Sequence, residues 1–197
     1  MTIKRLLIAN RGEIASRIIS SAHDMGISCV AIYTEADKDT PYVREADQAF
    51  KLSDSYLNSK EILDIALKSN SDAIHPGYGF LSENAAFANQ VKKLNIKWVG
   101  PSSNAIKKMG DKLTAKEIAI KANVPTLPMT SDPKKANSIG YPILVKAAAG
   151  GGGKGMRIVE KAKDLKESIK AAEREAEGGF GDKRVFLERY IKRSRHI

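Results

Sequence analysis

The chain has 197 residues, of which 42% are hydrophobic, and it carries 33 Lys and Arg against 23 Asp and Glu, a formal net charge of +10. These values predict a globular protein with a packed core, in one large domain or two small ones. No apolar run approaches the ~20 residues of a membrane span, and the N-terminus lacks the apolar core of a secretory signal. We therefore expect no membrane partner and a cytoplasmic location, with a mitochondrial or plastid origin still open for a mature chain.

The distribution of positive charge argues against nucleic-acid binding. Between residues 160 and 177 acids and bases interleave at helical spacing, as at Lys163 and Glu167, which is typical of a solvated helix face. Only residues 192–196 form a dense basic patch, and it lacks the aromatic residues that single-strand binders interleave. Phosphates, bicarbonate or an acidic partner protein fit this charge better.

The first hundred residues alternate apolar runs with amphipathic ones. Asn58 and Glu61 form a capping box for one helix, and we expect Ser82 to cap the next. Strands that alternate with helices predict an α/β fold with a doubly wound parallel sheet, which binds ligands at the carboxyl ends of its strands. The predicted strands are residues 5–9, 27–33, 49–52, 73–75 and 97–99, and the predicted helices are residues 13–25, 59–68 and 83–94.

Polar segments follow the first, second and fourth of these strands, at residues 10–13, 34–37 and 75–78. The first segment invites a dinucleotide-binding interpretation, with Glu35 or Asp37 as the acid that binds ribose. Its turn contains only Gly12, whereas that fingerprint needs three glycines to let the pyrophosphate approach. We therefore set the dinucleotide interpretation aside.

The chain contains one cysteine, Cys29, in the apolar strand 27–33. It has no second cysteine with which to form an internal disulfide, and no neighbour in the sequence would lower its pKa. We expect an inert core thiol.

Beyond residue 100 the pattern changes to short helices and extended segments. Helices are predicted at residues 103–109 and, behind an Asp111 cap, at residues 112–122. A further helix starts at Asp132 and Pro133 and ends at Gly140. The expected organisation is an N-terminal domain at residues 1–100, a helical connection at 101–128, and a small α+β lid subdomain at 129–197 that includes a charged helix at 164–177 and a strand at 184–191.

Lys146 lies in an apolar segment, residues 141–149, that leads into five glycines within residues 150–155. Burial of an ammonium costs free energy, so we expect an anionic partner for it. The bare N–H groups of the glycine run can close on phosphate oxygens. Because residues 156–159 are again extended in character, the pattern predicts a hairpin whose tip covers a polyphosphate.

Two other interpretations of the glycine run fit less well. A flexible linker is usually flanked by polar sequence, which this run is not. A P-loop needs a glycine where Ala148 stands, a Ser or Thr where Gly155 stands, and a helix immediately afterwards. We therefore predict ATP binding by a hairpin lid rather than by a helix N-terminus.

Four segments, taken in order, resemble a single family. They are residues 8–17 (IANRGEIASR), 75–84 (HPGYGFLSEN), 109–112 (MGDK), and Lys146 with its glycine loop. Together they resemble biotin carboxylase, the ATP-grasp component of biotin-dependent acetyl-CoA, propionyl-CoA, methylcrotonyl-CoA and pyruvate carboxylases. The resemblance covers the chain from Ile3 to its end.

The resemblance implies ATP-dependent carboxylation of biotin by bicarbonate through carboxyphosphate. The implied cofactors and substrates are ATP, Mg²⁺, bicarbonate, and biotin on a biotin carboxyl carrier protein, with a carboxyltransferase as a further partner. Residues 188–191 match the segment that contacts adenine, and Tyr78 and Glu83 match the region that faces biotin. The implied ATP-binding residues are Lys112, Lys146, Gly150, Gly151, Gly152, Gly153, Lys154, Gly155, Glu188, Arg189, Tyr190, Ile191 and His196.

The chain departs from the family pattern at several positions. Ala149 stands where a glycine is common, and Lys154 stands where many members have Arg, which loses the bidentate fork of a guanidinium. Arg17 and Asp24 resemble part of the family's dimer face, but Ser20 stands where a basic residue can occur, so a homodimer remains a possibility rather than an implication.

The family's catalytic and metal-binding residues match positions beyond Ile197. They are the carboxylates that bind Mg²⁺, the base that activates bicarbonate and the arginine that stabilises the biotin enolate. The resemblance therefore implies that the C-terminal ATP-grasp lobe is absent, that this chain holds no catalytic or metal-binding residue, and that it has no turnover by itself.

Two other functions remain open from the sequence. One is a short nucleotide-binding module without catalysis. The other is a different ATP-grasp ligase, such as a relative of carbamoyl-phosphate synthase, which would share the lid but should lack the segment at residues 75–84. The acyl-CoA or keto acid that finally receives the carboxyl group is not readable from this sequence.

Overall fold

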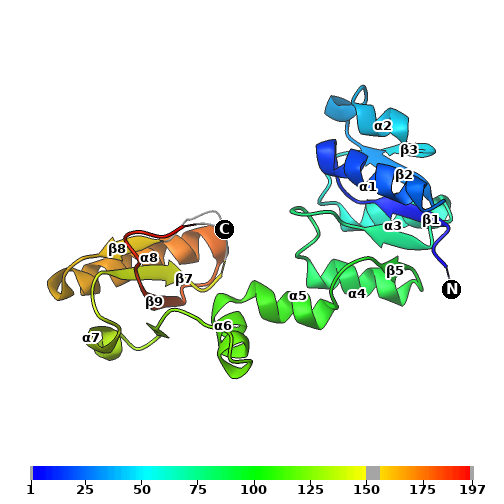
Figure 1. Cartoon of the computed structure of the whole chain (residues 1–197). Helices are drawn as coiled ribbons and strands as arrows, with labels where there is room; N and C mark the ends of the chain where they lie inside the picture. The colour runs from blue at the N-terminus through cyan, green and yellow to red at the C-terminus, as the bar shows by residue number, and fades with distance from the viewer. Residues whose placement is uncertain (1, 150–155, 196–197) are drawn as a thin grey trace. The chain divides into compact units, whose positions relative to one another are not determined.

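The computed structural model describes residues 2–149 and 156–195. The chain divides into two compact units, residues 1–107 and residues 108–197. Figure 1 shows the first unit in blue to green and the second in green to red.

Unit 1 is built on a five-stranded sheet with the order β3-β2-β1-β4-β5. All four pairings in it are parallel. This confirms the predicted doubly wound parallel sheet, with strand ends within two residues of the predicted ones. The strands are β1 (Arg5–Ile8), β2 (Ser28–Tyr33), β3 (Gln48–Lys51), β4 (Ala73–His75) and β5 (Lys97–Trp98).

Helices pack against both faces of this sheet because successive strand residues point to opposite sides. Leu6 and Ile8 join the core beneath α1 (Gly12–Asp24) and α2 (Pro41–Glu45). Leu7 and Ala9 join the core beneath α3 (Ser59–Lys68) and α4 (Ala85–Lys93), where Phe87 and Trp98 meet edge to face. The helix α5 (Ser103–Gly110) follows β5, and a 3₁₀ turn (Glu35–Asp37) precedes α2.

The caps of the unit 1 helices match the sequence in one case and correct it in another. The Asn58 side chain accepts the Glu61 N–H, as the capping box predicts. Ser82 is not the cap of α4, because it lies in a turn in which its own N–H donates to Gly79. The helix begins two residues later, where the Asn84 side chain accepts the Phe87 N–H at 2.9 Å.

Unit 2 contains an antiparallel sheet with the order β6-β9-β7-β8. Its strands are β6 (Met129–Thr130), β7 (Ile143–Ala147), β8 (Arg157–Val159) and β9 (Val185–Arg189), and its helices are α6 (Lys112–Lys121), α7 (Ala136–Ile139) and α8 (Leu165–Phe180), with 3₁₀ turns at Pro133–Lys135 and Ala162–Asp164. β7 and β8 pair antiparallel, as the predicted hairpin requires. Because a strand and not a helix follows the glycine segment, the P-loop interpretation is excluded.

One face of the unit 2 sheet is apolar and covered by helices. Ile143, Val145 and Leu187 point to this face and pack with Leu165 and Ala172 of α8. Asp111 and Asp132 cap their helices through the N–H groups of Thr114 and Lys134, as predicted. None of the helices in the described ranges is both long and apolar enough to cross a lipid bilayer.

We predict that Asn84→Ala destabilises unit 1 by about 1 kcal/mol, because it leaves the N–H of Phe87 without its cap. Ser82→Ala is the matched control and should change the free energy of unfolding by less than about 0.5 kcal/mol. Trp98 is the only tryptophan and lies in the unit 1 core, so its fluorescence during urea unfolding reports this unit. If Ser82→Ala lowered the free energy of unfolding as much as Asn84→Ala, Ser82 would have to be assigned a capping role after all.

Candidate functional site

The face of the unit 2 sheet opposite its apolar core carries the residues of the candidate nucleotide site. β7 and β9 pair with Lys146 opposite Phe186 and Leu144 opposite Glu188. Lys146 and Glu188 are therefore diagonal neighbours on the same face, a separation that long side chains can span. The strand register alone brings this ammonium and this carboxylate together.

Glu188 is buried and accepts hydrogen bonds from two lysines. Its Oε2 accepts a hydrogen bond from Lys146 Nζ at 2.9 Å, and its Oε1 accepts one from Nζ of Lys116, which lies in α6. Lys116 also donates to the carbonyl of Leu127 at 3.0 Å. The exposed fractions of the three side chains are 24% for Lys146, 15% for Lys116 and 11% for Glu188. We call these three residues the Glu188 cluster.

The electrostatics of the Glu188 cluster favour an ionised carboxylate. Burial works to raise the pKa of Glu188, but the hydrogen bonds from Lys116 and Lys146 outweigh it, and the pKa lies below its usual value. The sequence led us to expect a polyphosphate as the anion beside Lys146. In the structure the anionic partner of Lys146 is the carboxylate of Glu188. The Lys146 side chain is half-buried rather than fully buried.

Four further predicted nucleotide residues lie in the described part of unit 2: Lys112, Arg189, Tyr190 and Ile191. Lys112 begins α6, and its backbone N–H donates to the carbonyl of Ala148, just after β7. Arg189 and Tyr190 are anchored through their backbone N–H groups to the carbonyls of Pro128 and Pro142, each at 3.0 Å. Ile191 is exposed. The predicted contacts of Gly150, Gly151, Gly152, Gly153, Lys154, Gly155 and His196 fall outside the described residues.

Lys116 is the member of the cluster that sequence reasoning missed. It lies four residues after Lys112, so the two lysines stand on one side of α6. That spacing was the available signal, but a lysine-rich helix gives no reason to single out one side chain.

Unit 1 has its own polar cluster at the carboxyl ends of β1 and β4. The Asn10 side chain is buried and donates to the carbonyls of Pro76 and Tyr78, both at 2.7 Å. Gly77 has a positive φ of 62°, and a Cβ there would lie 2.6 Å from Nδ2 of Asn10. Any other residue at position 77 would therefore break the contact that shapes this turn.

The two predicted biotin-facing residues lie in or beside this turn. Tyr78 is 60% exposed, and its hydroxyl donates to a carboxylate oxygen of Glu13 at the start of α1. Glu83 is exposed in the turn before α4. His75 accepts the Gly77 N–H at its Nδ1, and burial together with the nearby Arg17 lowers its pKa. His75 is thus held as a neutral acceptor.

Asp37, which the sequence offered as a ribose-binding acid, is a buried structural carboxylate. It is held by the guanidinium of Arg11 and by the hydroxyl of Tyr56 at 2.6 Å. The Arg11 hydrogen bonds hold its pKa below the usual range. Tyr56 in turn shares a hydrogen bond with Tyr42 at 2.9 Å. This network orders the carboxyl edge of β1 and β2.

Cys29 is an inert core thiol, as predicted. It is fully buried, and burial raises its pKa to about 11. Its sulfur lies near His23 and Asp47, a grouping that could in principle hold a metal. Oδ2 of Asp47 already accepts the Cys29 N–H at 2.7 Å and contacts His23 Nε2 at 3.0 Å. We interpret the group as hydrogen bonds that link α1 and β2 to the residue just before β3.

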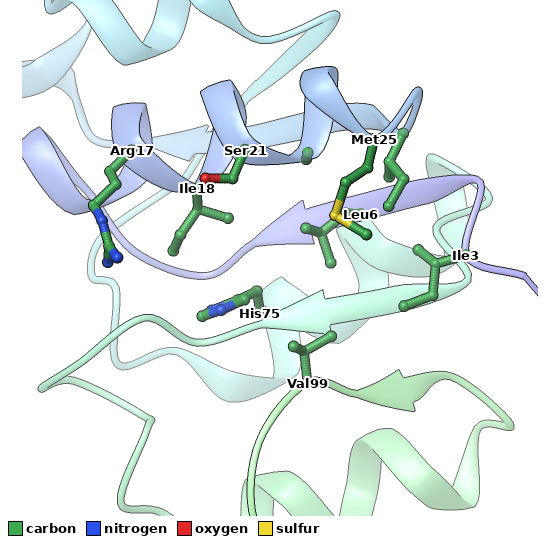
Figure 2. A pocket seen from close by; sticks show the side chains of 10 residues that line it. Ile3, Leu6, Arg17, Ile18, Ser21, Met25, His75 and Val99 are labelled. Carbon is green, nitrogen blue, oxygen red and sulfur yellow. The ribbon is translucent and has the colours of Figure 1, made fainter.

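A pocket of about 310 Å³ lies beside α1 on the sheet face over β4 (Figure 2). Its wall is mostly apolar, and Arg17 and His75 bring nitrogen atoms to one end of it. Tyr78 and Glu83 do not line it. Arg17, Ser20 and Asp24 line a separate depression along α1. The dimer face that Arg17 and Asp24 resemble in sequence, and from which Ser20 departs, stays a prediction.

Two family descriptions match the chain. "Biotin carboxylase, N-terminal domain" matches residues 2–106, and "Carbamoyl-phosphate synthase L chain, ATP binding domain" matches residues 111–197. The chain belongs to the biotin carboxylase family. The first match covers more than half of the chain and includes both motifs of unit 1, at residues 8–17 and 75–84.

Relatives of the biotin carboxylase family resemble the chain along almost its whole length. Biotin carboxylase 1 of Bacillus subtilis is 47% identical over 99% of this chain and 46% of its own length. The mitochondrial methylcrotonoyl-CoA carboxylase subunit alpha of Dictyostelium discoideum is also 47% identical over 99% of this chain, and 30% of its own length.

A solved structure has the same fold. The biotin carboxylase domain of 2-oxoglutarate carboxylase from Hydrogenobacter thermophilus, crystallised as a dimer with MgADP, ADP and bicarbonate, matches 98% of this chain and 45% of its own with a TM-score of 0.90 and 41% identity. The chain thus spans less than half the length of the proteins it matches.

We predict that Glu188→Gln destabilises unit 2 by about 1–3 kcal/mol, because two partly buried ammonium groups lose their counter-ion. Glu177→Gln, on the exposed side of α8, is the control and should change stability by less than about 0.5 kcal/mol. Hydrogen exchange of the β7 and β9 amides measures this unit alone.

The same carboxylate predicts a dependence of unit 2 stability on pH. The folded-state pKa of Glu188 is lowered, so its contribution is present above the usual glutamate pKa of about 4.3 and is lost as the pH falls through the folded-state value. In Glu188→Gln this part of the acid sensitivity of the β7 and β9 amides should disappear. An unchanged acid profile would show that Glu188 is not the ionised group described here.

Proposed function

We propose that this chain is the nucleotide-binding part of a biotin carboxylase, which carboxylates biotin on a carrier protein with ATP and bicarbonate. The observation that carries the proposal is the Glu188 cluster, whose Lys146 lies on β7, the strand that leads into the glycine segment. A half-buried ammonium, followed four residues later in the sequence by a run of glycines, is the chemistry that a triphosphate tail requires. Membership of the biotin carboxylase family, and a relative solved with MgADP and bicarbonate, support the assignment.

In this proposal each group of residues has a separate task. Lys146 and Lys112 contact phosphate oxygens, and residues 150–155 close over them. Backbone groups of residues 188–191 read the edge of adenine, Ile191 packs on the base, and His196 lies near the ribose. The ammonium groups stabilise the charge that gathers on the β- and γ-phosphate oxygens while a bicarbonate oxygen attacks the γ-phosphorus and ADP leaves. The resulting carboxyphosphate gives its carboxyl group to a biotin nitrogen and releases phosphate, which takes up the proton that this nitrogen loses.

Magnesium does not fit the carboxylate of the Glu188 cluster. Mg²⁺ demands oxygen ligands in near-octahedral geometry, and both oxygens of Glu188 already face ammonium groups. Glu188 is therefore a partner of lysines and not a metal ligand. We assign no step to a metal through the residues described in this region.

Unit 1 supplies the biotin-facing turn in this proposal. Glu13 and the buried Asn10 fix the turn that carries Tyr78, and Glu83 follows in the turn before α4. The proposed partners are a biotin carboxyl carrier protein, a carboxyltransferase and a second copy of the same protein. The dimeric state of the Hydrogenobacter domain supports the last of these.

A carbamoyl-phosphate synthase relative is the second candidate, because the corresponding family description matches residues 111–197. Such an enzyme also activates bicarbonate with ATP but passes it to ammonia rather than to biotin. The match of residues 2–106 to the biotin carboxylase N-terminal domain favours biotin as the acceptor. A nucleotide-binding module without catalysis remains the third alternative.

The test is bicarbonate-dependent ATPase activity of the full-length protein. We expect free biotin to stimulate ADP release, and Lys146→Met to lower kcat/KM for ATP by about 100-fold, the usual effect of losing one electrostatic contact to a transition state. Lys170→Met removes an exposed lysine of α8 and should leave activity unchanged. Stimulation by ammonia or glutamine in place of biotin would transfer the assignment to the second candidate.

A further inference from the structure

The Glu188 cluster holds more positive than negative charge. Two ammonium groups face one carboxylate, which leaves a formal excess of one positive charge (2 − 1 = 1) among side chains that are each less than a quarter exposed. Charges in such partly buried places interact more strongly than at the surface, because the surrounding dielectric constant is lower. An excess charge of this kind is an attraction for an incoming anion.

Lys116 determines which carboxylate oxygen of Glu188 is left to accept a hydrogen bond from Lys146. It takes Oε1 and leaves Oε2 for Lys146. Without Lys116, both carboxylate oxygens would be available to Lys146, which would then be held and neutralised by a carboxylate of its own. The Leu127 carbonyl, which also accepts from Lys116, fixes the ammonium at this place.

We propose that Lys116 is a positioning residue for the nucleotide, which keeps Lys146 oriented by Glu188 while preserving the cluster's excess positive charge for the phosphate tail. Lys116 acts through Glu188 and Lys146 and does not itself contact the reacting atoms. The inference rests on the proposed function, since it assumes that ATP phosphates bind beside Lys146.

A purely structural role is the rival explanation. Lys116 links α6 to β9 and to the Leu127 carbonyl, so its loss could loosen unit 2 without any effect that depends on charge. The two roles differ in whether the effect of Lys116 requires Glu188. A positioning role requires the effect of Lys116 on ATP to depend on Glu188, whereas a general loosening of unit 2 does not.

The experiment measures the dissociation constant of ATP, and kcat and KM for ATP, in the full-length protein. Lys116→Gln removes the charge but keeps a donor that can approach Leu127, and it should weaken ATP binding about tenfold, with KM raised and kcat changed less than twofold. Lys116→Arg keeps the charge and should bind ATP within about threefold of the unsubstituted protein. Lys121→Met, at the exposed end of the same helix, is the control for the loss of one lysine and should have no effect.

A double-mutant cycle with Glu188→Gln separates the two roles. In the Glu188→Gln background the loss of ATP affinity caused by Lys116→Gln should shrink to less than about threefold, because no carboxylate remains for Lys116 and Lys146 to share. A tenfold loss in both backgrounds would overturn the proposal, and so would ATP binding in Lys116→Gln equal to that in Lys121→Met. Should Lys116→Gln fail to fold, Lys116→Met takes its place in the cycle, with the same expected and contradicting results.

The design also distinguishes this inference from the proposed function. If the unsubstituted full-length protein does not bind ATP, or binds it without biotin-stimulated turnover, the proposed function fails. If that protein shows both properties and Lys116→Gln leaves ATP affinity unchanged, only the role of Lys116 fails.

Discussion

One buried carboxylate, that of Glu188, holds two ammonium groups on the face of the unit 2 sheet opposite its apolar core, and the candidate nucleotide site depends on this arrangement. Without a counter-ion, Lys146 and Lys116 would repel each other in a place that water reaches poorly. With one counter-ion between them, both are fixed, and the three residues of the Glu188 cluster together keep a formal excess of one positive charge. The register of β7 against β9 makes this possible, because it sets Lys146 and Glu188 on the same face while Ile143, Val145 and Leu187 fill the core on the other.

Unit 1 uses its polar residues in a comparable way, to build turns at the carboxyl ends of parallel strands. Asn10 fixes the turn after β4, and Asp37 binds Arg11 and Tyr56 beside the ends of β1 and β2. Buried polar groups of this kind cost free energy unless every one is hydrogen-bonded, so they hold a single geometry. Tyr78 is thereby carried on a preformed turn. The two units contribute different chemistry, a cationic strand face in one and an ordered polar turn in the other.

The sequence predicts the fold well because its signals are local. The apolar runs and the caps at Asn58, Asp111 and Asp132 each act within a few residues, and the structure confirms the elements they predict. The predicted cap of α4 was wrong because Ser82 and Asn84 are both good caps and the turn at Gly79 decides between them. The Glu188 cluster could not be predicted from spacing, since its pairs join residues 42 and 72 positions apart. Only the strand register and the placement of α6 bring them together.

The most direct test of this account is the titration of the Glu188 side chain by NMR of carboxyl-labelled glutamate, with Glu188→Gln to assign the resonance. The account predicts that this carboxylate stays ionised to a pH below the usual glutamate range, because Lys116 and Lys146 outweigh the cost of its burial. It also predicts that Lys116→Gln moves the titration toward higher pH. A resonance that titrates at or above the usual glutamate pKa, unaffected by Lys116→Gln, would contradict it.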